Sequence, residues 1–97
     1  LLLLLSTQHI KEKAFNDTGI EKLELNPGIK QIDNYAFNNN KLNQDELVIP
    51  ESITSMGIRS FLTKNPLRLN KLIYKTSAPM PQWFIRSAGA TLQLRIG

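Results

Sequence analysis

The chain has 97 residues, of which 41% are hydrophobic and 21% are charged, so it can form one domain around a single modest core. Cysteine is absent and histidine occurs once, which excludes disulfides, thiolate metal sites, a cysteine nucleophile and a multi-histidine metal site. Because the commonest acid–base side chain is so scarce, the composition argues against an enzyme, and we expect no cofactor and no metal.

The net charge of +4 is distributed unevenly along the chain. Residues 1–51 contain five Lys/Arg and eight Asp/Glu, whereas residues 52–97 contain seven Lys/Arg and no acid. A basic half of this kind favours an anionic partner such as a glycan or a lipid surface, or it is simply a solvated surface. The cations are scattered and few aromatic residues accompany them, so we expect no specific nucleic-acid binding.

The run from Leu1 to Leu5 opens the chain. It is far shorter than the roughly 18 apolar residues of a membrane helix, and it lacks the basic start of a signal peptide. We therefore expect no transmembrane segment. We interpret the run as a first strand within a monomeric fragment of a longer chain.

Apolar residues recur at the same relative positions along the chain, which is the signature of a repeat architecture. Residues 23–37 match residues 47–61 after a shift of 24, and they match residues 1–15 after a shift of 22. The matching positions are Leu1, Leu23 and Leu47; Leu3, Leu25 and Ile49; Ile10, Ile32 and Met56; Ala14, Ala36 and Ser60; and Phe15, Phe37 and Phe61. Leu72 and Tyr74 then open a fourth unit.

The repeated unit predicts its own local structure. Residues 23–25 alternate so that both Leu side chains lie on one face of a short strand. Such a strand buries that face only when copies stack, pairing in parallel at about 4.8 Å. Residues 26–29 predict a type II turn with Gly28 at the position that needs a positive φ. Residues 33–37 predict a helical turn that places Phe37 in the core.

The pattern Leu47-x-Ile49-Pro50-x-Ser52-Ile53-x-x-Met56-Gly57-x-x-Ser60-Phe61 resembles the BspA-type leucine-rich repeat of bacterial surface proteins. This resemblance implies an α/β leucine-rich-repeat solenoid with short parallel strands on its concave side, little helix and a C-terminal capping segment. Residues 1–75 would then form about three to four coils, and residues 76–97 the cap or closing strand. We expect Trp83 to cover the open end of the last coil.

The same resemblance implies a secreted or cell-surface parent that adheres to host matrix proteins, host cells or other microbes. It supplies no catalytic residues. Three functions stay open on the sequence: a protein- or glycan-binding module for adhesion, a structural spacer in a larger surface protein, and anionic-polymer binding by the basic C-terminal half.

The repeat also predicts which side chains a partner would meet. In each short strand the middle residue faces away from the core, and parallel stacking brings these residues within about 5 Å of each other. The predicted partner-binding residues on the concave face are Lys22, Glu24, Val48, Lys71, Ile73 and Lys75, with Leu2 as the middle residue of the first copy. Their ligand would be a protein or a glycan of unknown identity.

Overall fold

The computed structural model describes residues 2–4, 6–62, 68–81 and 93–96, and this part of the chain contains short strands and turns but no helix. The strands are β1 (Leu2–Leu4), β2 (His9–Ile10), β3 (Leu23–Leu25), β4 (Gln31–Ile32), β5 (Asn43–Ile49), β6 (Ser55–Met56), β7 (Arg68–Tyr74) and β8 (Gln93–Ile96). Five of them, β1, β2, β3, β4 and β6, have only two or three residues, whereas β5 and β7 have seven each.

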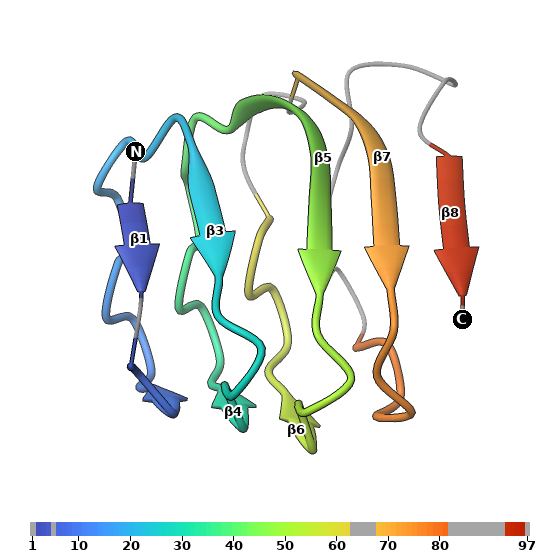
Figure 1. The fold of residues 1–97 in the computed structure, drawn as a ribbon. Helices are drawn as coiled ribbons and strands as arrows, with labels where there is room; N and C mark the ends of the chain where they lie inside the picture. The colour runs from blue at the N-terminus through green and yellow to red at the C-terminus, as the bar shows by residue number, and fades with distance from the viewer. Residues whose placement is uncertain (1, 5, 63–67, 82–92, 97) are drawn as a thin grey trace.

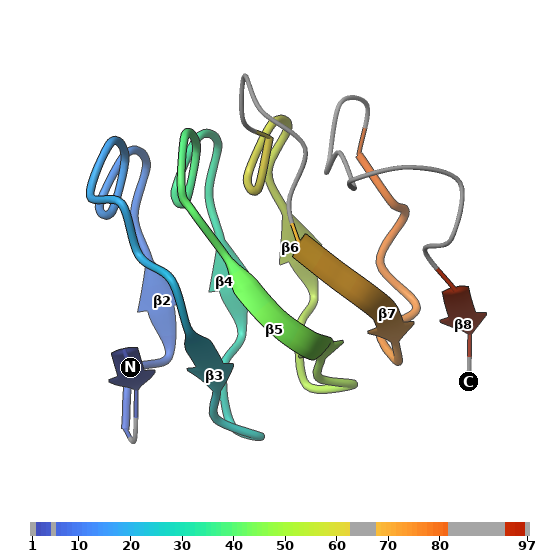
Figure 2. The same cartoon turned by 90° about the horizontal axis from the view of Figure 1, so that it is seen from above.

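The strands form two rows, and the chain passes from one row to the other and back (Figures 1 and 2). The front row contains β1, β3, β5, β7 and β8 side by side in chain order, and the second row contains β2, β4 and β6. Every paired strand is parallel to its neighbour, in the orders β1-β3, β2-β4-β6 and β5-β7-β8. The short parallel strands of a leucine-rich repeat are thus confirmed.

Where strands pair, the register agrees with the repeat except at its start. Ile32 lies opposite Met56, and Leu47 lies opposite Leu72, as predicted. In the first pair, however, Leu3 lies opposite Glu24, so the prediction that Leu2 holds the middle position is wrong by one residue. Five consecutive leucines offer no alternation between apolar and polar residues, and therefore nothing in that segment specifies the register.

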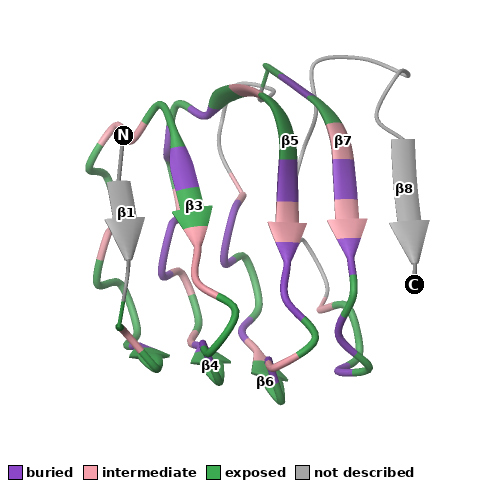
Figure 3. Ribbon diagram, in the orientation of Figure 1, coloured by how far each residue is buried: buried purple, intermediate pink, exposed green. Residues whose placement is uncertain are grey.

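The core lies between the two rows and consists of the repeated apolar positions, coloured purple in Figure 3. Phe37 is 1% exposed, and its ring stacks on Phe15 at a centroid distance of 5.3 Å and on Phe61 at 5.0 Å. The other buried repeat residues are Ile10, Leu23, Ile29, Ile32, Ala36, Leu47, Ile49, Ile53, Leu72 and Tyr74. The predicted inward positions between residues 23 and 61 are therefore correct, although Leu25 and Met56 are only half-buried. In the first copy, Ala14 was predicted to face inward but is exposed.

The predicted helical turn at residues 33–37 is wrong. Tyr35 has a φ of 60°, and the equivalent residues Lys13 and Arg59 have φ values of 58° and 53°. A residue in this left-handed region stops a right-handed helical turn. The repeat therefore makes its corner with a left-handed residue in each copy, and the helical part of the α/β prediction does not occur in the described residues.

The turn after β3 also differs from its prediction. The N–H of Ile29 donates to the carbonyl of Asn26 at 3.3 Å, but Gly28 does not have the positive φ of a type II turn. The side chain of Asn26 accepts the N–H of Gly28 at 2.8 Å, which fixes the turn in another conformation. The Asn26 amide also donates to the carbonyl of Thr7 in the preceding copy.

Only part of the predicted C-terminal cap lies within the described residues. β8 pairs in parallel with β7, and Tyr74 lies opposite Ile96. Trp83 and the rest of residues 82–92 lie outside the described residues. The division into repeats at 1–75 and a cap at 76–97 therefore stays a prediction.

Candidate binding face

The outward side of β3, β5 and β7, here called the strand face, carries the side chains that do not enter the core. On β7 the burial alternates, with Leu72 and Tyr74 buried, Lys71 and Ile73 half-buried, and Lys75 exposed. On β5, Glu46 is exposed and Val48 is half-buried, whereas Leu47 and Ile49 are buried. On β3, Lys22 and Glu24 are exposed on either side of buried Leu23. All six predicted partner-binding residues thus have side chains that solvent can reach.

The structure brings the β5 and β7 members of this set together. Val48 lies directly opposite Ile73, and Glu46 lies directly opposite Lys71. Directly paired residues in a sheet stand next to each other, so Val48 and Ile73 form an apolar pair on the strand face. Arg95 is next in this row, because it lies opposite Ile73 on β8.

The β3 members are separated from that pair by a break in the sheet. β3 and β5 are neighbours in the front row, but no hydrogen-bonded ladder joins them. The side-chain amide of Gln44 lies between them instead. Its Oε1 accepts the N–H of Leu23 at 2.8 Å, and its Nε2 donates to the carbonyls of Leu23 at 3.1 Å and Glu46 at 2.7 Å. The parallel ladder that was expected to join Glu24 to the column of Val48 and Ile73 is therefore absent between β3 and β5.

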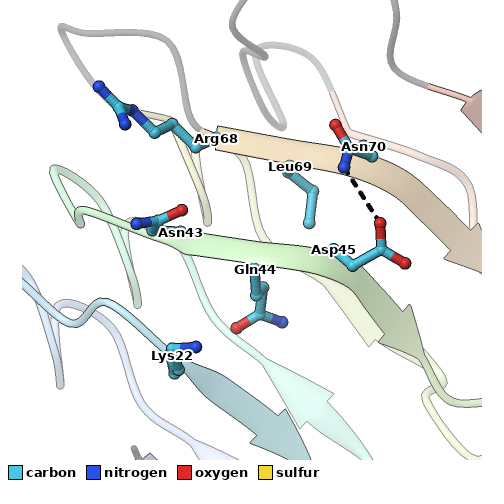
Figure 4. Close-up of a pocket in the computed structure, with 7 residues that line it drawn as sticks. All are labelled: Lys22, Asn43, Gln44, Asp45, Arg68, Leu69 and Asn70. Carbon is cyan, nitrogen blue, oxygen red and sulfur yellow. Dashed lines mark hydrogen bonds between the residues drawn. The ribbon is translucent and has the colours of Figure 1, made fainter.

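The break has a simple origin in the sequence. Ten residues separate Phe37 from Leu47, compared with eight between Phe15 and Leu23. The two additional residues extend β5 at its N-terminal end, where Gln44 can turn back towards β3 (Figure 4). A glutamine amide has the same donor and acceptor groups as a peptide unit and can replace one in a ladder.

Two shallow depressions lie beside the break between β3 and β5. The first, here called the recess, is about 450 Å³ and is lined by Lys22, Leu23, Glu24, Leu25, Gln44, Glu46, Leu47 and Val48. The second is about 460 Å³ and is lined by Lys22, Asn43, Gln44, Asp45, Arg68, Leu69 and Asn70 (Figure 4). Because Lys22 and Gln44 line both, the two depressions adjoin.

Few charges on this face are already paired. Lys71 Nζ lies 3.9 Å from Asp45 Oδ2, and the Asn70 amide donates to Asp45 Oδ1 at 3.0 Å. Within the described residues, neither Glu24 nor Glu46 forms an ion pair. The same is true of the cations Lys22, Arg68 and Lys75. These five charged groups are therefore available to a partner.

The described cations of the basic half do not all lie together. Arg68, Lys71 and Lys75 lie on or just after β7, whereas Arg59 occupies a left-handed corner of the repeat. Lys64 and Arg86 lie outside the described residues. The cations that the basic half contributes to the strand face thus lie on the side of β7, and Lys22 is a further cation on the side of β3.

His9 and Tyr74, two other titratable residues of the described region, make contacts within the fold. His9 Nε2 and Asp33 Oδ2 are 2.8 Å apart and join the turns of successive copies. Burial raises the pKa of Tyr74 above its ordinary value, and its hydroxyl donates to the carbonyl of Ala78 at 2.8 Å. No group of three or more His, Cys, Asp or Glu side chains in this region could hold a metal ion.

Two features of the face were not predicted from the sequence. Leu69 is buried, although it follows no earlier repeat position, because β7 begins four residues before its core residue Leu72. Gln44 was not identified as a bridge between strands. The only available signal was the longer joint before Leu47, since a longer joint must place its additional residues somewhere.

The family model described as BspA type leucine rich repeat region (6 copies) matches residues 3–78 of this chain. The chain therefore belongs to the BspA-type leucine-rich-repeat family, as the resemblance indicated. This membership suggests a repeat module that binds protein, in a family generally found in bacterial surface proteins. No curated protein and no solved structure matches the chain. In the part that the structure describes, no helix is long and apolar enough to cross a membrane.

Proposed function

We propose that this chain is a non-catalytic solenoid module that binds a protein or glycan ligand as part of a cell-surface or secreted adhesion protein. The observation that carries the proposal is the apolar pair Val48 and Ile73, half-buried side by side on an otherwise charged strand face. An apolar centre with a polar rim is the usual anatomy of a protein-binding surface. The depressions are open, which suits a macromolecule better than a small molecule.

The test replaces both apolar residues. Val48→Asp with Ile73→Asp should abolish binding to whichever ligand is retained from a panel of purified matrix proteins and glycans. Because both side chains face outward, the circular dichroism spectrum should stay unchanged. Ile58→Asp is the matched control, since Ile58 is 44% exposed but lies on the turn after β6 rather than on the strand face. Undiminished binding by the folded double variant would remove the strand face from the proposal.

A second candidate is binding of an anionic polymer by the side of β7. The observation favouring it is the line of Arg68, Lys71 and Lys75, with Arg95 on the adjacent strand. Polyanion binding would weaken linearly in a plot of log affinity against log salt. Affinity for heparin that does not change with salt would exclude it. A structural spacer is the outcome if neither class of ligand binds.

A further inference from the structure

The recess between β3 and β5 has an acidic and apolar lining. Leu23 corresponds to Leu47 in the repeat, so a regular parallel ladder would bond the N–H of Leu23 directly to the carbonyl of Glu46. The Gln44 amide is inserted between those two groups and bonds to both. The surface is therefore hollow here, at the point where the strands would otherwise be joined.

The lining of the recess matches a basic side chain. Glu24 from β3 and Glu46 from β5 line the recess, and Lys22 is the single cation among its lining residues. Leu25 and Val48 contribute apolar surface, and both are half-buried. A lysine or arginine has an aliphatic stem and a charged head, so it can contact both kinds of surface at once.

The side of β7 has the opposite charge. Lys71 and Lys75 are the outward residues on either side of Ile73. Lys71 forms a long ion pair with Asp45, at 3.9 Å, and Lys75 has no ion-pair partner in the described residues. Three groups of side chains therefore follow one another from β3 to β7: the recess with its two carboxylates and one lysine, the apolar pair of Val48 and Ile73, and the outward lysines of β7. Glu46 of the recess lies directly opposite Lys71.

From this order of side chains we propose that the strand face binds an extended protein segment that crosses the strands. The segment presents a basic side chain to the recess, an apolar side chain to Val48 and Ile73, and an acidic side chain to Lys71 and Lys75. Side chains on one face of an extended chain repeat at about 6.7 Å, so three alternate side chains span about 13 Å. Neighbouring strands lie about 4.8 Å apart, so this length exceeds the roughly 10 Å across three strands and is sufficient to cross the strand face. The proposal rests on the proposed function, and it deepens it by naming the chemistry of the partner.

The experiment uses three immobilised peptides and the full chain. Their sequences are Lys-Ser-Leu-Ser-Glu, Lys-Ser-Leu-Ser-Lys and Glu-Ser-Leu-Ser-Glu, each capped at both ends. At low salt the unaltered chain should bind the mixed-charge peptide about three- to tenfold more tightly than either of the others, because exposed ion pairs each contribute modestly. Surface plasmon resonance would measure the three affinities.

Charge reversal then switches the preference. The variant with Glu24→Lys and Glu46→Lys should prefer the peptide with two glutamates, and the variant with Lys71→Glu and Lys75→Glu should prefer the peptide with two lysines. A gain of binding cannot arise from misfolding, so a switch supports the proposal even if one variant is less stable. Equal affinities, no binding, or an unchanged preference in the variants would overturn it. The proposed function would survive that result if the Val48 and Ile73 double variant still lost its panel ligand.

Discussion

β5 is joined to its two neighbouring strands in different ways. Towards β7, residues from Asn43 to Ile49 pair directly with residues from Arg68 to Tyr74. Towards β3, the ladder is absent and the amide of Gln44 fills its place. The copies that contain β3 and β5 are nevertheless in register elsewhere, because β4 pairs with β6 and Phe37 stacks on Phe61. The core and the second row therefore hold these copies together, while the strand face accommodates the longer joint.

The largest expected effect comes from removing the aromatic stack. Phe37→Ala should lower the free energy of unfolding by about 3–5 kcal/mol, the usual loss for a buried aromatic residue. Phe37 contacts a stacked ring on both sides, whereas Phe15, at the end of the stack, is only half-buried. Phe15→Ala is therefore the matched control and should cost less. A chemical denaturation curve that places Phe37→Ala within about 1 kcal/mol of the parent would contradict the role given to the stack.

The second effect tests the close approach of the copies at the second row. A Cβ atom on Gly57 would lie 2.2 Å from the backbone N of Asn34 and the backbone C of Asp33. Gly57→Ala should therefore cost about 3 kcal/mol, because backbone atoms must move to make room. At Gly28 the nearest atom to an added Cβ is the end of the Asn26 side chain at 3.2 Å. Gly28→Ala should thus cost clearly less in the same denaturation experiment, and similar losses would show that the copies are not held tightly there.

The sequence predicted the part of the fold that depends on the repeat. Positions such as Ile32, Leu47 and Phe61 recur in type, and all three are buried. The left-handed corner at Tyr35 could not be predicted in this way, because neither a lysine, a tyrosine nor an arginine signals a positive φ as glycine does. The position of the candidate face was predictable from alternation alone, whereas its division at Gln44 depends on a side chain replacing the backbone.

The third effect tests this replacement directly. Gln44→Ala removes the oxygen that accepts the N–H of Leu23 and the amide nitrogen that donates to the carbonyls of Leu23 and Glu46, and should cost about 2 kcal/mol. Amide hydrogen exchange at Leu23 should also become faster, since its N–H loses its acceptor. Gln31→Ala is the matched control on β4, where the side chain is exposed, and it should change stability by less than about 0.5 kcal/mol. Equal stabilities and unchanged exchange at Leu23 would mean that the amide does not bridge the strands.

The smallest expected effect is a pH dependence of the free energy of unfolding. It involves Tyr74 on β7, the strand that pairs directly with β5. Burial raises the pKa of Tyr74 in the folded chain, so the folded state retains the phenol proton at a pH where the unfolded state has begun to lose it. The unfolded state then binds fewer protons, and stability falls as the pH rises from the ordinary tyrosine value through the raised one. Tyr74→Phe removes this dependence and also the hydrogen bond to Ala78, at a cost of about 1 kcal/mol near neutral pH. Tyr35→Phe, which removes one phenol elsewhere, should keep the fall in stability at alkaline pH. The contrary result is that the parent and Tyr74→Phe lose the same free energy of unfolding as the pH rises through this alkaline range. In that case, burial of the Tyr74 hydroxyl is not the source of the alkaline sensitivity.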